Sequence, residues 1–449
     1  MAARKFSRRR FLKTTAAASA TAVFAPYIRT SHAAGKLEVG FWDHWVPGAN
    51  DTLTKLCQEW AAKEKVEIKI DYIPSQGNKN LLTIAAESQA KSGHDMLAMP
   101  SWWPAQYAKD LEPVDDVMKD VMAANGGVSP LIDYLGKHNG HWAGIPATPG
   151  SQIKGPCGRI DLFKQHAGLD IVKMYPAGGP PDKALSEAWT WDAFLDAATK
   201  CHKAGSPFGV GLGQTTDSVD TMGALFSSYG AELVNAKGAI TVKSDAVKQV
   251  LEYMKKLVAV LPPDVFAWDD ASNNKWLVSG KGALIMNPPS AWAVAKRDAP
   301  KVAEQCWTFP SPRGPKGRFQ PYLPYFWSVW KFSKNKAAAK SLIRHISQRS
   351  AVEKMVAASQ GYDIPAFAKL NDFKTWAEEG PPKGTLFNYP PKPGQILSIS
   401  AFPAPPAIAQ QIYAQAITTK MVAKCTQGGE SIDNAIAWAA KELEGFMRT

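Results

Sequence analysis

Apolar positions in the first hundred residues follow two different spacings. Some segments show the two-residue period of a strand, and others show the helical period, with Leu53, Leu56 and Trp60 on one face. Asn50 or Asp51 can cap the first of these helices. Strands that alternate with helices of this length indicate βαβ units and a parallel sheet. The predicted strands are 37–41, 66–70 and 95–99, and a second helix is predicted over 80–91.

The rest of the chain continues the mixture of strands and helices. Thr190 is a predicted helix cap, and the Pro-rich stretch 380–406 predicts loops with aromatic residues interleaved. The further predicted strands are 208–212 and 282–286, and the further predicted helices are 246–261, 336–349 and 431–446. The pattern therefore predicts the α/β class, and the length allows two or more domains with buried cores.

Two of the predicted strands end in clusters of tryptophan and polar residues. In parallel sheets, ligands bind beyond the carboxyl ends of the strands. Indole rings stack on the C–H faces of sugars, and a carboxylate accepts hydrogen bonds from their hydroxyls. We therefore expect ligand contacts from both clusters. They are Trp42, Asp43, His44 and Trp45 after the first strand, and Ser101, Trp102 and Trp103 after the third.

The first 33 residues have the order of a bacterial export signal. They hold seven Lys and Arg and no Asp or Glu, then an apolar stretch over 14–25 and the small-residue site Ser31-His32-Ala33. The pair Arg8-Arg9 indicates the twin-arginine route. The apolar stretch is too short for a membrane anchor, which needs ~20 residues. We predict a signal peptide over 1–33 and a periplasmic location.

Charge and cysteine usage narrow the function further. Without residues 1–33 the chain holds 45 basic and 40 acidic side chains, a net charge of +5, and no long run of like charge. Binding of nucleic acid or anionic lipid is therefore disfavoured. The five cysteines form no Cys-x-x-Cys pair, which argues against a zinc ribbon or redox motif. We expect buried, inert thiols, no metal site and no cofactor.

An ordered series of weak motifs covers most of the chain. It includes Asn139-Gly-His-Trp-Ala-Gly-Ile-Pro146, Thr190-Trp-Asp-Ala-Phe194, Trp276-Leu-Val-Ser-Gly-Lys-Gly-Ala-Leu-Ile-Met286 and Gly428-Gly-Glu-Ser-Ile-Asp-Asn-Ala435. In this order the motifs resemble extracellular solute-binding proteins of ATP-driven importers, the maltose-binding-like family 1. One departure is Tyr325-Phe326, where many members have a Gly-Gly pair, so we expect a tighter or more aromatic pocket there.

The resemblance implies a two-lobed periplasmic-binding-protein fold of type II. Each lobe would be a sheet flanked by helices, and three hinge crossings would join them. Lobe 1 would comprise 35–146 and 309–347, and lobe 2 would comprise 147–308 and 348–449. A small carbohydrate would bind in the cleft, and closure would present the monomer to the transmembrane permease subunits. Further ligand contacts are expected from Asp217, Asn287, Trp292, Tyr325, Phe326, Tyr362 and Asp363.

Several alternatives stay open at this point. The position of Asp43 fits a helix cap equally well, and that of His44 fits a surface histidine. The same fold would bind a polyamine or a quaternary ammonium solute through rings and carboxylates. A glycan-cleaving enzyme would need two carboxylates across the cleft, for which Asp43 and Asp217 are the candidates. Ser151-Gln-Ile-Lys154 matches a Ser-x-x-Lys pattern, but its companion motifs are absent, so we expect no catalytic residues.

Overall fold

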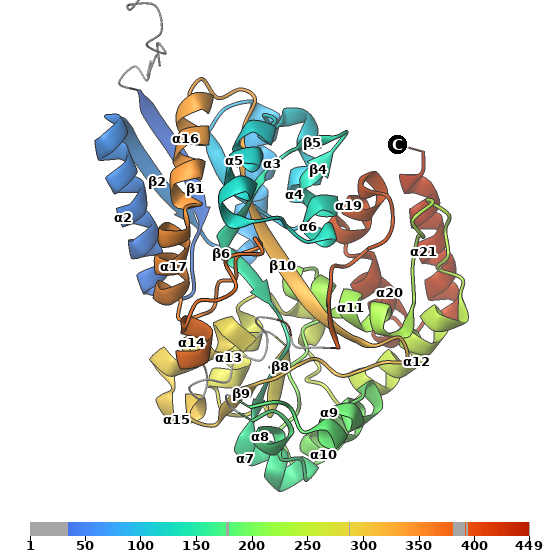
Figure 1. Ribbon diagram of the computed structural model, residues 1–449. Coiled ribbons are helices and arrows are strands. Elements are labelled where there is room, and N and C mark those ends of the chain that lie inside the picture. Colours follow the sequence, from blue (N-terminus) through green and yellow to red (C-terminus); the bar gives the residue numbers. More distant parts are fainter. Residues whose placement is uncertain (1–34, 177–178, 287, 380–390, 392–393, 449) are drawn as a thin grey trace, which may run out of the picture.

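The structure is a computed structural model that describes residues 35–176, 179–286, 288–379, 391 and 394–448. The predicted signal peptide and Asn287 lie outside these residues. Two sheets with surrounding helices make up the described part, one in the upper half of Figure 1 and one in the lower half.

The larger sheet has the strand order β11-β10-β3-β1-β2, and β6 pairs with β10 off this path. Strands β1, β2 and β3 are parallel, whereas β10 runs antiparallel to β3 and to β6. The predicted βαβ opening is therefore present. The strands are β1 (Lys36–Trp42), β2 (Glu67–Ile73), β3 (Met96–Pro100), β6 (Ile145–Ile153), β10 (Arg318–Val329) and β11 (Gln395–Ser398).

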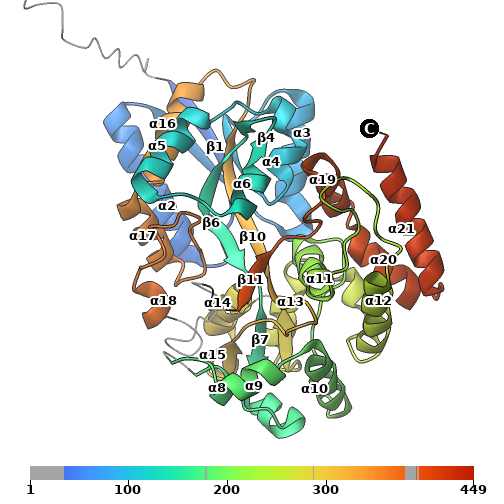
Figure 2. The same cartoon turned by 45° about the vertical axis from the view of Figure 1, so that its right-hand side comes forward.

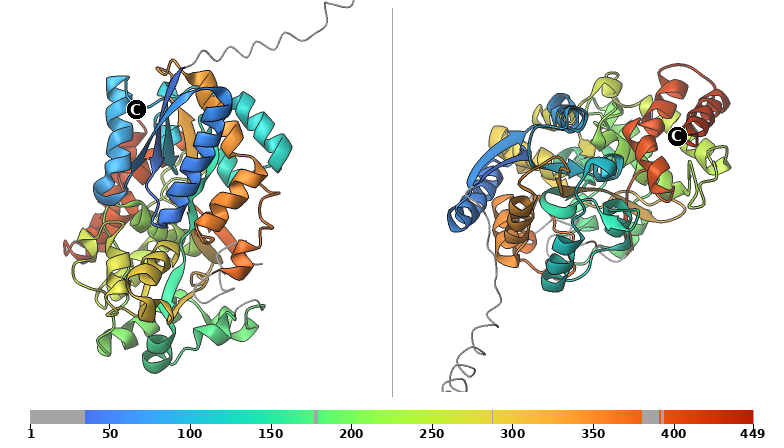
Figure 3. Two further views of the ribbon diagram at one scale, coloured as in Figure 1. Left: turned by 90° about the vertical axis from the view of Figure 1, so that its left-hand side faces the viewer. Right: turned by 90° about the horizontal axis from the view of Figure 1, so that it is seen from above.

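Helices cover both faces of this sheet (Figure 3). Helices α16 and α17 lie against α2, because each presents an apolar stripe to the same core. The helices around the larger sheet are α2 (Pro47–Glu64), α3 (Lys79–Ala90), α4 (Trp103–Gln106), α5 (Asp115–Asn125), α6 (Pro130–Gly136), α16 (Lys336–Ile346) and α17 (Arg349–Ala358). A short hairpin, β4 (Lys137–His138) and β5 (His141–Trp142), precedes β6.

The smaller sheet has the order β8-β7-β9, with β7 antiparallel to both neighbours. Its strands are β7 (Pro156–Arg159), β8 (Leu284–Met286) and β9 (Cys306–Thr308). The helices around it are α7 (Ile160–Leu162), α8 (Ile171–Met174), α9 (Lys183–Ala188), α10 (Trp191–Lys203), α11 (Thr216–Tyr229), α12 (Asp245–Val258), α13 (Ser272–Val278), α14 (Pro288–Asp298) and α15 (Pro300–Ala303).

The C-terminal helices return to both halves. Helix α19 packs against α4 in the half that holds the larger sheet, whereas α20 and α21 pack against α12 in the half that holds the smaller sheet. Strands β6 and β10 run side by side through the middle and pass from one half into the other (Figures 1 and 2). The remaining helices are α18 (Thr375–Glu378), α19 (Pro406–Ala414), α20 (Ile417–Thr426) and α21 (Ile432–Phe446).

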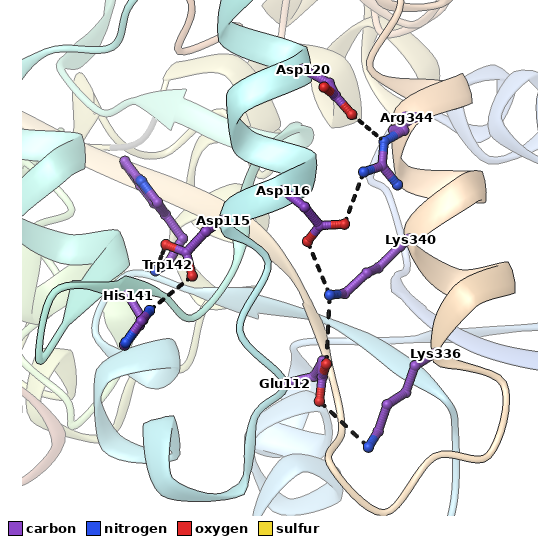
Figure 4. A network of polar contacts seen from close by, with 9 residues as sticks. All are labelled: Glu112, Asp115, Asp116, Asp120, His141, Trp142, Lys336, Lys340 and Arg344. Atoms are coloured by element: carbon purple, nitrogen blue, oxygen red, sulfur yellow. Dashed lines mark hydrogen bonds and ion pairs between the residues drawn. The ribbon is translucent and has the colours of Figure 1, made fainter.

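Ion pairs join α5 and α16 along one side of the larger sheet (Figure 4). Lys340 Nζ lies 3.0 Å from Asp116, and Arg344 bridges Asp116 and Asp120 at 2.9 and 2.7 Å. The acidic residues on α5 and the basic residues on α16 are each four positions apart, so successive turns of the two helices form ion pairs with each other. These side chains are partly exposed, so each pair contributes at most about 1 kcal/mol to stability.

Two predictions about local structure are wrong. Helix α2 begins at Pro47 rather than at Asn50 or Asp51, because Pro47 occupies the first helical turn with its φ already fixed. Residues 208–212 form no strand: only Gly209 makes an isolated bridge, to Ile285 of β8. A side chain at Gly209 would collide with Trp276 and Trp268, so this segment is shaped by close packing against rings.

The expected burial of the cysteines is confirmed. All five cysteines are buried and free. Across the described part of the chain, every helix falls short of the length and hydropathy that crossing a bilayer requires.

Candidate functional site

A cluster of aromatic rings lies where three distant segments meet. The Trp42 ring, at the carboxyl end of β1, is 5.6 Å from the Tyr325 ring of β10 and 5.9 Å from the Tyr362 ring. The His44 ring lies 4.6 Å from Tyr362, edge to face. All four side chains are buried. The strand-end cluster predicted from the sequence thus meets the predicted residues Tyr325 and Tyr362.

His44 is fixed in one tautomer by two hydrogen bonds. The Val46 N–H donates to Nδ1 over 2.9 Å, so this nitrogen carries no proton. The proton is therefore on Nε2, which donates to Oδ1 of Asp363 over 3.0 Å. The Gly150 N–H donates to the same carboxylate oxygen over 2.9 Å. His44 is thus a buried structural donor rather than a surface histidine.

The backbone of β6 lets Tyr325 reach this cluster. Gly150 has φ +89°, and a Cβ there would lie 2.8 Å from the Tyr325 ring. Only glycine adopts this conformation freely while leaving room for a ring. Successive residues of β10 face opposite sides, so Phe326 points away, toward Gly136 and Gly144. Tyr325 is therefore at the candidate site, and Phe326 is in the core of the larger sheet.

A buried ion cluster adjoins the rings. Lys154, just after β6, places Nζ 2.7 Å from Asp217 Oδ1 and 2.9 Å from Asp220 Oδ2. The two aspartates are three residues apart on α11, so they share one helix face. Thr215 caps this helix by accepting a hydrogen bond from the Ser218 N–H. The Asp217 carboxylate also accepts a hydrogen bond from Asn273 Nδ2 over 3.0 Å.

A third carboxylate, Asp270, belongs to the same cluster. Burial raises its pKa to about 7, and the negative charge of Asp217 adds to this effect. Burial also raises the pKa of Asp220 to about 6, against the opposing effect of Lys154. The Lys154 ammonium loses hydration by burial, but the three carboxylates overcome this and raise its pKa. The charges of this cluster are therefore strongly interdependent.

The rings and the ion cluster form a single site. Burial and the nearby Asp217 charge raise the pKa of the Tyr362 hydroxyl, and Asp270 and Asp217 act likewise on Tyr325. Side chains from β10, from the segment after α17 and from α11 therefore face each other here.

The free space at this site is small. A cavity of about 10 Å³ is lined by Thr215, Asp217, Thr221, Trp268 and Asn273, with others. This is about the size of one water molecule. A solute larger than water can therefore enter only if the two halves separate or side chains shift.

The other predicted residues lie at differing distances from this site. Trp103 packs on Tyr413 of α19, which interacts with Asp220 and Ser101. Trp102 is buried, and its indole N–H donates to the Ser400 carbonyl over 3.1 Å. Trp292 lies in a separate small core and has Lys296 over its ring at 4.7 Å.

Two residues after the first strand lie outside the cluster. Asp43 is exposed and accepts a hydrogen bond from Asn50 in the first part of α2. Trp45 is half-buried against the core. The prediction for Asn287 falls outside the described residues.

Lys154, Asp220, Asp270 and Tyr413 were absent from the sequence-based candidates. A signal for Lys154 was present: it is the only charged residue from 142 to 158. A lone charge in such a stretch is buried only when it is paired. Its partners could not be predicted, because Asp220 is 66 residues away.

The geometry does not favour a serine nucleophile. Ser151 Oγ donates to the Ala147 carbonyl over 2.6 Å and accepts from the Tyr325 N–H over 2.8 Å. The Lys154 ammonium faces carboxylates instead. Among the residues that the structure describes, no group of His, Cys, Asp or Glu side chains is arranged to hold a metal ion.

A larger hollow of about 560 Å³ lies elsewhere, lined by α10, α12, Tyr229 and Arg313. Its lining residues come from α10, α12, the end of α11 and the segment 313–315, and none comes from β1, β2 or β3 of the larger sheet. We therefore keep the site between the sheets as the candidate.

Comparison with known proteins gives one family and many related structures. The sequence profile described as bacterial extracellular solute-binding protein matches residues 47–351. A curated relative from Sinorhizobium fredii (strain NBRC 101917 / NGR234), named "Probable amino-acid ABC transporter periplasmic-binding protein", is 29% identical over 239 residues. The match covers 51% of each chain, so the chain spans about half the length of the curated relative.

Solved structures share the fold along almost the whole chain. Maltose-bound MalE3 of Thermotoga maritima is similar with a TM-score of 0.70 and 19% identity, covering 92% of this chain and 99% of that one. The GacH receptor of Streptomyces glaucescens GLA.O, solved unliganded and with acarbose, has a TM-score of 0.71 and 18% identity, and the match covers 93% of this chain and 99% of that one. A solute-binding protein of Thermotoga lettingae with α-D-tagatose has a TM-score of 0.72 and 17% identity, and the match covers 92% of this chain and 99% of that one. The expected two-lobed α/β fold is confirmed.

Proposed function

The chain belongs to the bacterial extracellular solute-binding protein family, and on that premise we propose that it captures a small carbohydrate, a sugar or a polyol, between its two lobes. We further propose that closure on the solute delivers it to the permease of an ATP-driven importer. The single observation that supports this most is the meeting of Trp42, Tyr325 and Tyr362 with the Lys154–Asp217 cluster between the two sheets.

These side chains suit the chemistry of a sugar or polyol. Such solutes combine hydroxyls, which need fixed acceptors and donors, with C–H faces that stack on rings. The site offers indole and phenol faces together with carboxylates held by hydrogen bonds, such as Asp217 with Asn273. Carboxylates held in this way accept strong, charge-assisted hydrogen bonds from hydroxyls.

The proposed closure of the two lobes has a physical cause, because different segments of the chain each supply part of the site. Trp42 comes from β1 of the larger sheet, whereas Asp217 comes from α11, which packs against β10 and lines the small cavity together with Met286 of β8. A solute that touches both groups binds more tightly when the lobes are closed, so it shifts the population toward the closed state. The proposed lobes are 35–146 with 309–347, and 147–308 with 348–449, except that α17 (Arg349–Ala358) packs against α2 and α16 and so goes with the first of them. The proposed location is the periplasm, reached by the twin-arginine route as a monomer.

A second candidate is a cationic solute, such as a polyamine or a quaternary ammonium compound. The specific observation in its favour is that three buried carboxylates, Asp217, Asp220 and Asp270, face one buried ammonium, Lys154. Rings beside carboxylates also bind cations through cation–π contacts.

A thermal-shift screen tests the proposal. The purified protein would be heated with monosaccharides, disaccharides, polyols, polyamines and betaines, one at a time. A solute at 100 times its Kd stabilises the native state by about 2.7 kcal/mol, which raises the Tm measurably. Stabilisation by sugars or polyols supports the proposal, and stabilisation by cations alone supports the second candidate. New reducing ends from a bound oligosaccharide would indicate a glycan-cleaving enzyme instead.

A further inference from the structure

The candidate site has more negative than positive side chains. Asp217, Asp220 and Asp270 are each more than nine-tenths buried, and so is Lys154. The cluster therefore has one cation for three carboxylates. Buried carboxylates without a balancing charge are costly, so they become protonated or acquire a cation.

Part of the hydrogen-bonding capacity of this cluster is unused. Asp270 Oδ1 has no hydrogen-bond partner among the described residues, although Oδ2 accepts from Thr216 Oγ1 over 3.3 Å. Thr221 Oγ1, on the wall of the small cavity, also lacks a partner within the described part of the chain. Both side chains are more than nine-tenths buried. Buried polar atoms in native proteins are almost always paired, so these two atoms are available to pair with a solute that enters the site.

The second acidic group at the site does not balance the charge. Asp363 is bonded to His44, but the tautomer of His44 is the neutral one, so this pair adds a further negative charge. Tyr362 of the aromatic cluster is close to both acidic groups: burial raises the pKa of its hydroxyl, and the charges of Asp217 and Asp363 add to this effect. A cation placed there would be attracted by carboxylates and by ring faces together.

We infer that the solute carries one protonated amine on a hydroxylated body, as in an amino sugar or an amino polyol, with the ammonium directed at Asp270 and its neighbours. This inference rests on the proposed function and narrows its ligand class. An ammonium with N–H groups donates to the unused carboxylate oxygen, whereas a quaternary ammonium has no N–H to donate. The hydroxyls of the same solute would meet Thr221 and the indole N–H of Trp42, which also lacks a partner among the described residues.

The arrangement also disfavours a polyamine. A polyamine has several ammonium groups spaced along a chain, so it needs separate carboxylates for each. Here the three aspartates surround the same lysine, because Asp217 and Asp220 both contact Lys154 and Asp270 is affected by both Asp217 and Lys154. One additional positive charge fits this cluster better than several.

The test compares matched solutes by isothermal titration calorimetry at pH 7.5. Each set pairs an amino polyol or amino sugar with its neutral parent: 1-amino-1-deoxy-D-sorbitol with D-sorbitol, and D-glucosamine with D-glucose and N-acetyl-D-glucosamine. Spermidine and glycine betaine represent cations without a sugar-like body. We expect the amine of at least one set to bind tenfold or more tightly than its neutral partner.

Two variants show whether the preference comes from this cluster. Asp270→Asn removes one carboxylate and should reduce the preference for the amine by tenfold or more. Asp264→Asn makes the same change at an exposed residue of the same proposed lobe and should leave the preference for the amine unchanged. Because the wild-type comparison needs no variant, a folding defect in Asp270→Asn does not prevent the test.

The other outcomes separate the two proposals. Equal binding of an amine and its neutral parent overturns this inference and leaves the proposed carbohydrate function standing. Binding of spermidine or betaine alone overturns the inference in favour of the second candidate. Absence of binding by every solute in the set overturns both the inference and the proposed function.

Discussion

His44 Nε2 lies 3.0 Å from Asp363 Oδ1, which joins two residues that are 319 positions apart in the chain. Both side chains are buried, and the Gly150 N–H completes the contact. This pair therefore ties the end of β1 to the segment after α17 and to β6. It holds Trp42 and Tyr362 on the same side of the candidate site.

Replacing His44 with alanine should destabilise the protein by about 2–4 kcal/mol, because it leaves a buried carboxylate short of a donor. The measurement is chemical denaturation followed by tryptophan fluorescence. His141→Ala is the control, because His141 is exposed and its contact with Asp115 is at the surface. If both variants lose the same free energy of unfolding, the His44–Asp363 hydrogen bond adds no more stability than a surface pair does.

Replacing Lys154 with methionine should lower the free energy of unfolding by about 3–5 kcal/mol at pH 7.5, because Asp217 and Asp220 lose the ammonium that pairs with both. The loss should shrink at pH 5, because the pKa of Asp220 is raised to about 6 and this carboxylate is then mostly protonated. Lys200→Met is the matched control, since Lys200 pairs with Asp196 in an exposed position and should cost less than about 1 kcal/mol. A pH-independent loss would show that Lys154 acts through packing instead of charge.

Stability should fall as the pH rises from about 4 to about 7. In the folded protein the pKa is raised to about 6 for Asp220 and to about 7 for Asp270, above the value of about 3.9 in an unfolded chain. Within this window the folded state holds protons that the unfolded state has released, so the free energy of unfolding decreases with rising pH. One proton corresponds to a slope of about 1.4 kcal/mol per pH unit.

Asp270→Asn should flatten this slope, and the difference between the two proteins cancels the effect of other titrating groups. The charged groups that act on Asp270 are Lys154 and Asp217; Thr216 donates to its Oδ2, and Tyr325 faces it from β10. Parallel pH profiles for the variant and the wild type would contradict the raised pKa of Asp270.

Thr221→Val should weaken solute binding without lowering stability. The Thr221 hydroxyl is buried and has no partner in the described part of the chain, so its removal leaves no broken hydrogen bond. Thr419→Val is the control: that buried hydroxyl donates to the Ala416 carbonyl over 3.0 Å, and its loss should cost about 1 kcal/mol. The prediction fails if the two variants lose similar stability.

The sequence allowed much of the fold to be predicted, because the signals are local. Thr190 caps α10 as expected, and Ser431 caps the predicted C-terminal helix α21 in the same way, since a hydroxyl before an apolar helix satisfies the first free N–H groups. Segment 208–212 was mistaken for a strand because its apolar residues resemble one. Its true environment depends on Trp268 and Trp276, more than fifty residues away.

The candidate site could be predicted only in part. Trp42 and His44 follow from the rule that ligands lie beyond strand ends. Lys154 and Asp220 were not predicted, because their pairing depends on how the end of β6 lies against α11, and no local sequence pattern indicates that packing. For Trp102 the ligand contact stays a prediction: its strand-end position predicts one, and its indole N–H donates to the Ser400 carbonyl.

The most direct test of the central claim is a calorimetric titration of the best stabilising sugar, polyol or amine from the thermal-shift screen. It would be made into wild type, Asp217→Asn and the exposed control Asp264→Asn, after circular dichroism shows that each is folded. The account predicts one site in the wild type and the control, and an affinity at least tenfold weaker in Asp217→Asn. Unchanged affinity in Asp217→Asn would show that the solute binds elsewhere and would contradict the account.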